Sequence, residues 1–208
     1  MSRIGFPTTD GGQMRLTCLR HGVTELNAQG IFSSMGREGL TQSQRQDLAA
    51  VEFEAADFDA VYCSPAWRCR ETASVLGMHE LIVEPRLAER EFGVFEGLTG
   101  EQCRQRYPSE FEAFRRLDAG FVIPGGESRE QHMDRVLAWL GDVGHHRHVL
   151  AVTHGGTIDF LYRLGAGEPP HGGTTVFAGP NAARSVFDVS LPSISVVEHG
   201  VRLVPSPW

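Results

Sequence analysis

Two short segments of the chain place a histidine between an apolar run and a glycine. They are Leu19–Gly22 (LRHG) and Val152–Gly156 (VTHGG). Glycine permits tight turns and a close approach of the backbone to a ligand. If both apolar runs are parallel strands, His21 and His154 lie together at the carboxyl edge of the sheet, where open α/β folds bind ligands. Helix N-termini at such an edge favour an anion.

The sequence brings three more chemically useful side chains to the same edge. Arg20 precedes the first histidine, and Arg68 lies in the first turn of a helix expected to begin at Ser64-Pro65. A further strand is expected to end near Glu89. Neutral imidazole can act as a nucleophile at phosphorus. Arginines bind phosphoryl oxygens and stabilise transition-state charge, and a protonated carboxyl group can protonate a leaving alkoxide. This set predicts phosphoryl transfer through histidine, with a proton held on Glu89 at the start.

Composition restricts the alternatives. The chain has 208 residues and a net charge of −7, and all 19 of its basic residues are arginine. The acidity argues against nucleic acid or an anionic membrane as a partner. The absence of lysine excludes Schiff-base chemistry and a P-loop lysine, so a phosphate site must use arginine, histidine and backbone N–H groups. Residues 1–13 lack the apolar stretch of a signal peptide, no apolar run is long enough to span a membrane, and the four cysteines lack metal-site spacing. We therefore expect a cytoplasmic protein with reduced thiols.

Strands alternate with helices along the chain. Thr41 and Gln44, and again Ser128 and Gln131, have the spacing of a helix-starting capping box. The pattern predicts strands over Met14–Leu19, Phe58–Cys63, Leu81–Val83 and Val149–Val152, and helices over Thr41–Glu54 and Ser64–Leu76, from Ser128 onwards, and from Gly156 to Leu164.

This alternation favours one α/β domain over residues 1–208, with a three-layer α/β/α architecture and a mostly parallel central sheet. The arginine- and aromatic-rich stretch at about 97–124 is expected to be a small helical cap insertion. Towards the C-terminus, runs at 185–189, 194–197 and 201–204 are strand-like, and Glu198–Gly200 is expected to turn a β-hairpin between the last two. The edge of this hairpin could pair with a second copy in a homodimer.

Five segments carry the candidate residues in one order along the chain. They read RHGVTELN from Arg20, CSPAWRCRETA from Cys63, LAEREFGVFEG from Leu87, PGGES from Pro124 and VTHGG from Val152. Together, over residues 14–165, they resemble the motifs of the histidine phosphatase superfamily, in its phosphoglycerate-mutase-like branch.

The resemblance implies a role for each matching position. His21 would be the phosphorylated nucleophile and Glu89 the proton donor. The substrate would be a small phosphorylated metabolite, as in the broad-specificity and α-ribazole-phosphate phosphatases, and no metal or organic cofactor is expected. The implied phosphate-pocket and substrate-binding residues are Arg20, Arg68, His154, Asn27, Thr24 and Gly155.

Departures from the family pattern favour a phosphatase over a mutase. Where relatives that act on sugar phosphates carry an Arg-x-Gln-Gly stretch and an aspartate before Pro-Leu-Thr, this chain has Ile31, Ser33, Ser34, Arg37 and Gly39. A second substrate phosphate would find few partners there. Two alternatives remain open: a cofactor-dependent phosphoglycerate-type mutase, and a catalytically weak module that binds a phosphorylated ligand for regulation.

Several other residues have ordinary structural explanations. Glu89 could instead pair with Arg86 or Arg90, and Arg70 is expected to face solvent. His145, His146 and His148 are expected to satisfy carbonyls or face solvent. The cap arginines Arg104, Arg106, Arg115 and Arg116 are expected to form an exposed face. The aromatic residues expected to form the core of the cap, or alternatively an apolar rim for aromatic phosphate esters, are Phe92, Phe95, Tyr107, Phe111, Phe114 and Phe121.

Overall fold

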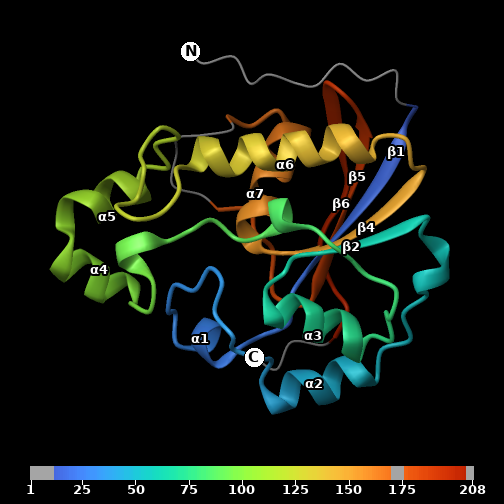
Figure 1. Ribbon diagram of the computed structural model, residues 1–208, viewed down its shortest axis with the longest axis horizontal. Helices are drawn as coiled ribbons and strands as arrows, with labels where there is room; N and C mark the ends of the chain where they lie inside the picture. The colour runs from blue at the N-terminus through green and yellow to red at the C-terminus, as the bar shows by residue number, and fades with distance from the viewer. Residues whose placement is uncertain (1–11, 170–175, 205–208) are drawn as a thin grey trace.

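The computed structural model describes residues 12–169 and 176–204, which form an α/β fold around one sheet (Figure 1). The strand order is β3-β2-β4-β1-β5-β6. The first four strands in this order are parallel to one another, β5 is antiparallel to β1, and β6 is antiparallel to β5. The three-layer α/β/α fold with a mostly parallel central sheet, expected from the sequence, is confirmed. The strands are β1 (Met14–Arg20), β2 (Ala60–Cys63), β3 (Ile82–Val83), β4 (His148–Thr153), β5 (Ala183–Ser190) and β6 (Ser193–Arg202).

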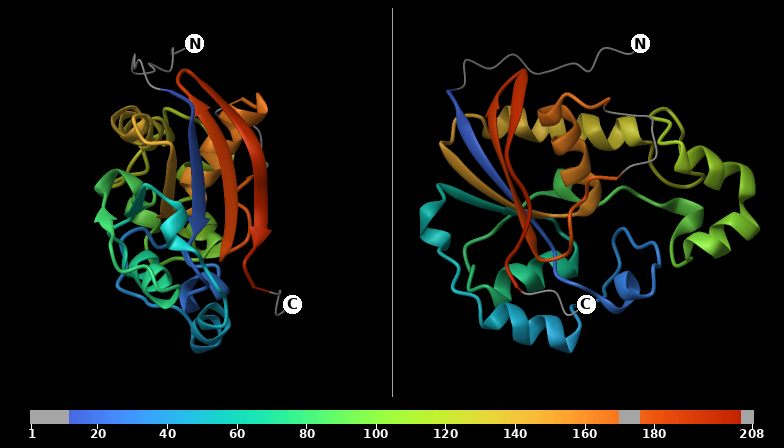
Figure 2. Two further views of the ribbon diagram at one scale, coloured as in Figure 1. Left: turned by 90° about the vertical axis from the view of Figure 1, so that its right-hand side faces the viewer. Right: turned by 180° about the vertical axis from the view of Figure 1, so that it is seen from behind.

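Helices cover both faces of the sheet and extend beyond one end of it (Figures 1 and 2). Helices α6 and α7 pack on one face, and α2 and α3 on the other. The α-helices are α1 (Glu25–Ala28), α2 (Gln42–Ala49), α3 (Trp67–Val75), α4 (Gly100–Arg106), α5 (Pro108–Arg115), α6 (Arg129–Val143) and α7 (Gly155–Ala166), and the 3₁₀ turns are η1 (Ala55–Asp57), η2 (Pro85–Leu87) and η3 (Gly93–Phe95).

Strand β4 shows why the central run of the sequence is apolar throughout. Val149 and Ala151 pack towards α6 and α7, whereas Leu150 and Val152 pack towards α2 and α3. Successive side chains of a strand point to opposite faces, so a strand covered on both sides must be apolar at every position. This central position fixes the end of β4 beside that of β1, with Arg20 paired to Thr153.

The two expected capping boxes differ in outcome. Ser128 and Gln131 form a complete capping box at the start of α6, as expected. At α2, the Thr41 hydroxyl accepts a hydrogen bond from the Gln44 backbone, but the Gln44 side chain accepts one from the Val23 N–H instead. The expectation that this helix continues to Glu54 was wrong, because α2 ends at Ala49.

Helices α4 and α5 project from the sheet as the cap (Figure 1). The aromatic residues of the insertion pack into a small cluster of their own with Phe32, around buried Phe95 and Phe111. This confirms the expected aromatic core of the cap. The four cap arginines are exposed, also as expected.

The C-terminal hairpin exists, but its expected position was wrong. The turn lies at Leu191-Pro192, between β5 and β6, and residues 194–202 are one continuous strand. His199 and Gly200 form a bulge in this strand, because Arg184 pairs with Val201 while Val186 pairs with Glu198. Gly200 has a φ of +67°. A glycine with positive φ serves a bulge as well as a turn, so its presence in the sequence could not separate the two.

None of the helices in the described ranges combines the length and the apolar character of a membrane span. All four cysteines are buried free thiols. At the end of α6 the His145 ring bonds the Asp142 carbonyl, and Arg70 on α3 is exposed, both as expected.

Candidate active site

The ends of β1 and β4 bring the two histidines together. His21 and His154 are buried, and their ring centroids lie 5.2 Å apart. Each follows the last residue of its strand, and the parallel register that pairs Arg20 with Thr153 places them side by side. The expectation that both stand at the carboxyl edge of the sheet is confirmed.

Hydrogen bonds define the proton position on His21. Its Nδ1 lies 2.7 Å from the Gly22 carbonyl oxygen, which can only accept, so Nδ1 carries the proton. Burial, together with the positive charges of Arg68 and Arg20, holds the pKa of His21 well below its ordinary value. The ring is therefore neutral near pH 7, with its lone pair on Nε2. The Arg68 Nε–H donates to this nitrogen over 3.2 Å.

His154 has the opposite tautomer. Its Nδ1 accepts a hydrogen bond of 3.1 Å from Arg68 Nη2, so its proton is on Nε2 and is directed to the Ser64 hydroxyl 2.7 Å away. Burial and the Arg68 charge lower the pKa of this ring as well. The expectation that Ser64 caps α3 was wrong, because the N-cap is Ala66. Ser64 instead orients the buried histidine, and the only other contact of this ring nitrogen within the described residues is the weaker acceptor Cys69 Sγ at 3.4 Å.

The two arginines differ in how fully they are engaged. Arg68 is buried and donates from all three of its nitrogens to protein acceptors. Arg20 donates from Nη1 to the Gly179 carbonyl, but within the described residues its buried Nε has no partner. Burial lowers the pKa of the Arg20 guanidinium, while the Glu89 charge opposes that shift. An unused buried N–H beside two neutral histidines suits an incoming anion.

The sequence had suggested that Glu89 follows the end of a strand, but Glu89 reaches this edge from a loop. Strand β3 ends at Val83, and η2 intervenes. One carboxylate oxygen accepts from the Arg90 N–H at 2.9 Å and the other from the Gly156 N–H, at the start of α7, at 3.2 Å. The ion pair with Arg86 considered above is absent from the described contacts, because Arg86 pairs with Glu84 and Asp142.

Comparison with known proteins identifies the family of this chain. The family model described as "Histidine phosphatase superfamily (branch 1)" matches residues 16–201. The chain belongs to the histidine phosphatase superfamily. The adenosylcobalamin/alpha-ribazole phosphatase of Escherichia coli is 31% identical over 75% of this chain and 81% of its own length. A 2,3-bisphosphoglycerate-dependent phosphoglycerate mutase of Parvibaculum lavamentivorans is 28% identical over 70% of this chain and 77% of its own length.

Solved structures agree on the fold of this superfamily member. The alpha-ribazole phosphatase from Shigella flexneri superimposes with a TM-score of 0.73 and 24% identity, covering 94% of this chain and all (100%) of the other.

The remaining substrate-binding candidates of this superfamily member lie near the histidines but have structural partners. Thr24 is buried and caps α1, where it forms a capping box with Asn27. The Asn27 side-chain oxygen also lies 3.4 Å from Asn181 Nδ2, which donates to the His21 carbonyl over 3.0 Å. Gly155 opens α7 against Arg20, and an added Cβ there would lie 3.3 Å from Arg20 Cζ.

Sequence reasoning missed three residues of the site. Asn181 joins the backbone of His21 to Asn27, Ser64 orients His154, and Gly156 donates its N–H to Glu89. The signal available for Asn181 was composition, because Asn27 and Asn181 are the two asparagines of the chain.

A cavity of about 460 Å³ adjoins Glu89, and neither His21 nor His154 is among the described residues that line it. Met35 and Pro65 are among its apolar lining, and Glu91 and the ion pair of Glu127 with Arg135 contribute its charge.

Proposed function

We propose that the protein is a metal-independent phosphatase that hydrolyses small phosphomonoesters through a phosphohistidine on His21. The observation that carries this proposal is the hydrogen bonding of the buried His21 ring. Its Nδ1 proton is bound by the Gly22 carbonyl, which leaves the Nε2 lone pair beside Arg68. A buried neutral imidazole flanked by cationic donors suits attack on a phosphoryl group.

The proposed reaction has two steps. His21 Nε2 forms a bond to phosphorus while the bond from phosphorus to the ester oxygen breaks, and the Glu89 carboxyl proton passes to the leaving oxygen. Water then forms a bond to phosphorus, the nitrogen–phosphorus bond breaks, and the water proton passes to Glu89. Arg20, Arg68 and His154 surround the transferred group, and the arginines neutralise the charge that develops on its oxygens.

The segment of residues 31–39 supports a phosphatase over a mutase. The carbonyls of Ser33 and Ser34 face Arg68, and the Ser34 N–H and hydroxyl are both bonded to the Glu96 carboxylate. These groups are thus unavailable to hold a second substrate phosphate. Relatives named as alpha-ribazole phosphatases are consistent with a small phosphorylated metabolite as substrate.

Replacement of the nucleophile tests this proposal. We expect His21→Ala to lower kcat for p-nitrophenyl phosphate by about 10⁴-fold or more, since loss of a covalent nucleophile removes the reaction path. His145→Ala, at an exposed histidine, should keep full activity. Quenched turnover should trap acid-labile phosphate on the wild type, and EDTA should leave its rate unchanged. Full activity in His21→Ala would rule out the proposed mechanism.

A further inference from the structure

Residues 33–38, here called the Arg68-covering segment, close over the site described above. Glu38 Oε1 accepts a hydrogen bond of 2.8 Å from Arg68 Nη1, and the side chains of this ion pair are 15% and 2% exposed. Arg68 Nη2 donates to the carbonyls of Ser33 and Ser34 at 3.1 and 2.7 Å. A carboxylate of the protein thus holds the arginine that the proposed reaction needs.

The same contacts affect the nucleophile. With its outer nitrogens held by Glu38, Ser33 and Ser34, Arg68 directs its Nε–H to the Nε2 lone pair of His21. That lone pair must be released before it can attack phosphorus. In this arrangement the Arg68 Nε–H and the His21 lone pair satisfy each other.

Local geometry holds Glu38 in this position. The Ser33 hydroxyl donates to the same carboxylate oxygen over 2.8 Å. A Cβ at Gly36 would overlap the other oxygen of Glu38, so glycine at this position leaves room for the carboxylate to fold back.

Two further carboxylates anchor the chain on either side of this contact. Glu96, beside the cap, binds the Ser34 N–H at 2.9 Å. Glu71 of α3 binds the Leu40 N–H at 2.6 Å. The chain on either side of Glu38 is thus held by Glu96 near the cap and by Glu71 of α3, and Glu38 itself contacts Arg68.

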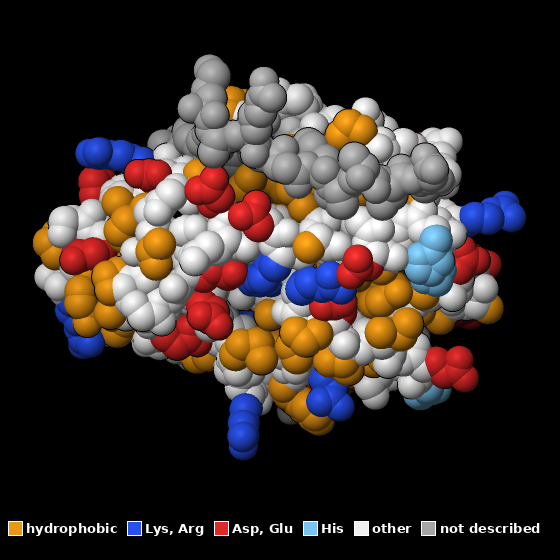
Figure 3. Space-filling model, turned by 45° about the horizontal axis from the view of Figure 1, so that its top comes forward, with side chains coloured by type: hydrophobic (Ala, Val, Ile, Leu, Met, Phe, Trp, Pro, Cys, Tyr) orange, Lys and Arg blue, Asp and Glu red, His pale blue; other side chains and the backbone are white. Residues whose placement is uncertain are grey.

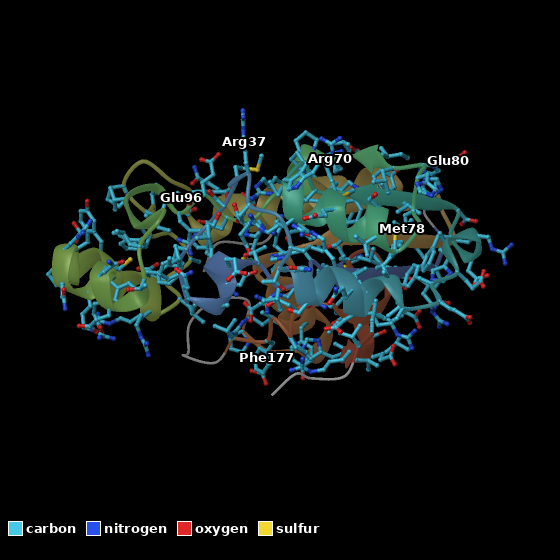
Figure 4. The ribbon with its side chains drawn as sticks, turned by 90° about the horizontal axis from the view of Figure 1, so that it is seen from below. Arg37, Arg70, Met78, Glu80, Glu96 and Phe177 are labelled. Carbon is cyan, nitrogen blue, oxygen red and sulfur yellow. The ribbon has the colours of Figure 1, made fainter. Side chains whose placement is uncertain are left out.

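We propose that Glu38 is a competing carboxylate that occupies Arg68 in the absence of substrate and that a phosphoryl group must displace. This inference rests on the proposed function, because it assigns the Arg68 site to a phosphoryl group. Two anions cannot share one arginine without repulsion, so Glu38 weakens phosphate binding. A phosphomonoester dianion carries more charge than a carboxylate and can displace it, so Glu38 favours doubly charged ligands. The neighbouring Arg37 does not offset this charge, since it points away from the molecule (Figure 4).

Binding of inorganic phosphate, measured by isothermal titration calorimetry at pH 7.5, tests the inference without turnover. We expect Glu38→Gln to bind phosphate about tenfold more tightly than the wild type, because one charge-assisted contact no longer competes. Gly36→Ala retains the carboxylate but leaves no space for it in the site, so it should shift binding in the same direction. Glu80→Gln removes the same charge far from this segment and should leave the affinity unchanged (Figure 4).

Unchanged or weaker phosphate binding by folded Glu38→Gln would overturn the inference, because it would mean that Glu38 serves to position Arg68. Should Glu38→Gln fail to fold, the Gly36→Ala result decides, and affinity no tighter than that of the wild type is then the contrary outcome. Either result leaves the His21→Ala test of the proposed function untouched, since that test measures turnover.

Discussion

At the scale of single residues, Gly156 determines where Glu89 can lie. The Gly156 N–H binds the Glu89 carboxylate, and a Cβ at this position would overlap Glu89 Oε1 and approach the buried His132 ring to 3.0 Å. The backbone of Gly156 has no positive φ, so an alanine is disfavoured there by space and not by conformation. The second glycine after His154 is thus explained by the carboxylate that it admits.

We expect Gly156→Ala to displace Glu89 and so to remove proton donation to the leaving group. The rate with β-glycerophosphate, a poor leaving group, should fall about 10²-fold or more, and the rate with p-nitrophenyl phosphate by less than tenfold. Glu89→Gln should show the same difference between the two substrates. Equal losses for both substrates in both variants would argue against an acid role for Glu89.

At the scale of elements, α6 holds the loop that carries Glu89. Arg135 donates from Nη1 to the Arg86 and Ala88 carbonyls at 2.6 and 2.9 Å, and from Nη2 to the Glu89 carbonyl at 3.1 Å. It also forms an ion pair with Glu127, which precedes the helix. One guanidinium thus joins the helix to three backbone carbonyls within residues 86–89 and to the Glu127 carboxylate. A lysine ammonium has three N–H donors and could not form all five of these hydrogen bonds.

We expect Arg135→Lys to lower the free energy of unfolding by about 2–4 kcal/mol, because partly buried carbonyls lose their donors while the charge is kept. Urea denaturation measures this directly. Arg70→Lys, at an exposed arginine of α3, is the matched control and should change the free energy of unfolding by less than about 0.5 kcal/mol. Equal free energies of unfolding for the two variants would show that the Arg135 hydrogen bonds to the Glu89 loop do not contribute to stability.

At the scale of the whole molecule, charge is distributed locally and not as one broad field. The net charge is −7, and the face in Figure 3 carries acidic and basic side chains interspersed among apolar ones. The positive charge that the proposed phosphate site needs comes from Arg68, which is buried, and from Arg20, which is partly buried. Burial and these neighbouring charges keep the pKa values of His21 and His154 low, and burial with the Arg135 charge does the same for the pKa of His132.

These three histidines predict how stability depends on pH. Their pKa values are lower in the folded than in the unfolded chain, so the unfolded chain binds more protons below about pH 6.5. Their contribution is therefore complete above that pH and is lost as the pH falls, at up to about 4 kcal/mol per pH unit for three groups. Urea denaturation at pH 7.5, 6.0 and 5.5 should show this fall, and His132→Gln should reduce its slope by about a third. A stability that does not change over this range would contradict the burial of neutral rings.

The sequence by itself determined the residues that could react and the edge at which they meet. Each candidate follows an apolar run or a turn signal, and the parallel order of the strands requires the ends of β1, β2 and β4 to lie together. The residue types of the cap and of β4 likewise predicted their burial. The aromatic side chains of the cap form its core, and the continuous apolar run of β4 is buried on both faces.

Tertiary structure alone decided how those residues are held. Ser64 has the form of a helix cap but binds His154, 90 positions away, and Asn181 reaches across 160 positions to the His21 carbonyl. Glu38 lies in an exposed-looking, glycine-flanked stretch, yet it folds onto Arg68. Side-chain hydrogen bonds depend on distances across the fold, which local spacing does not encode. Hydrophobic periodicity does encode which face of an element is buried, and this is why the sheet was predictable and the partners of its polar residues were not.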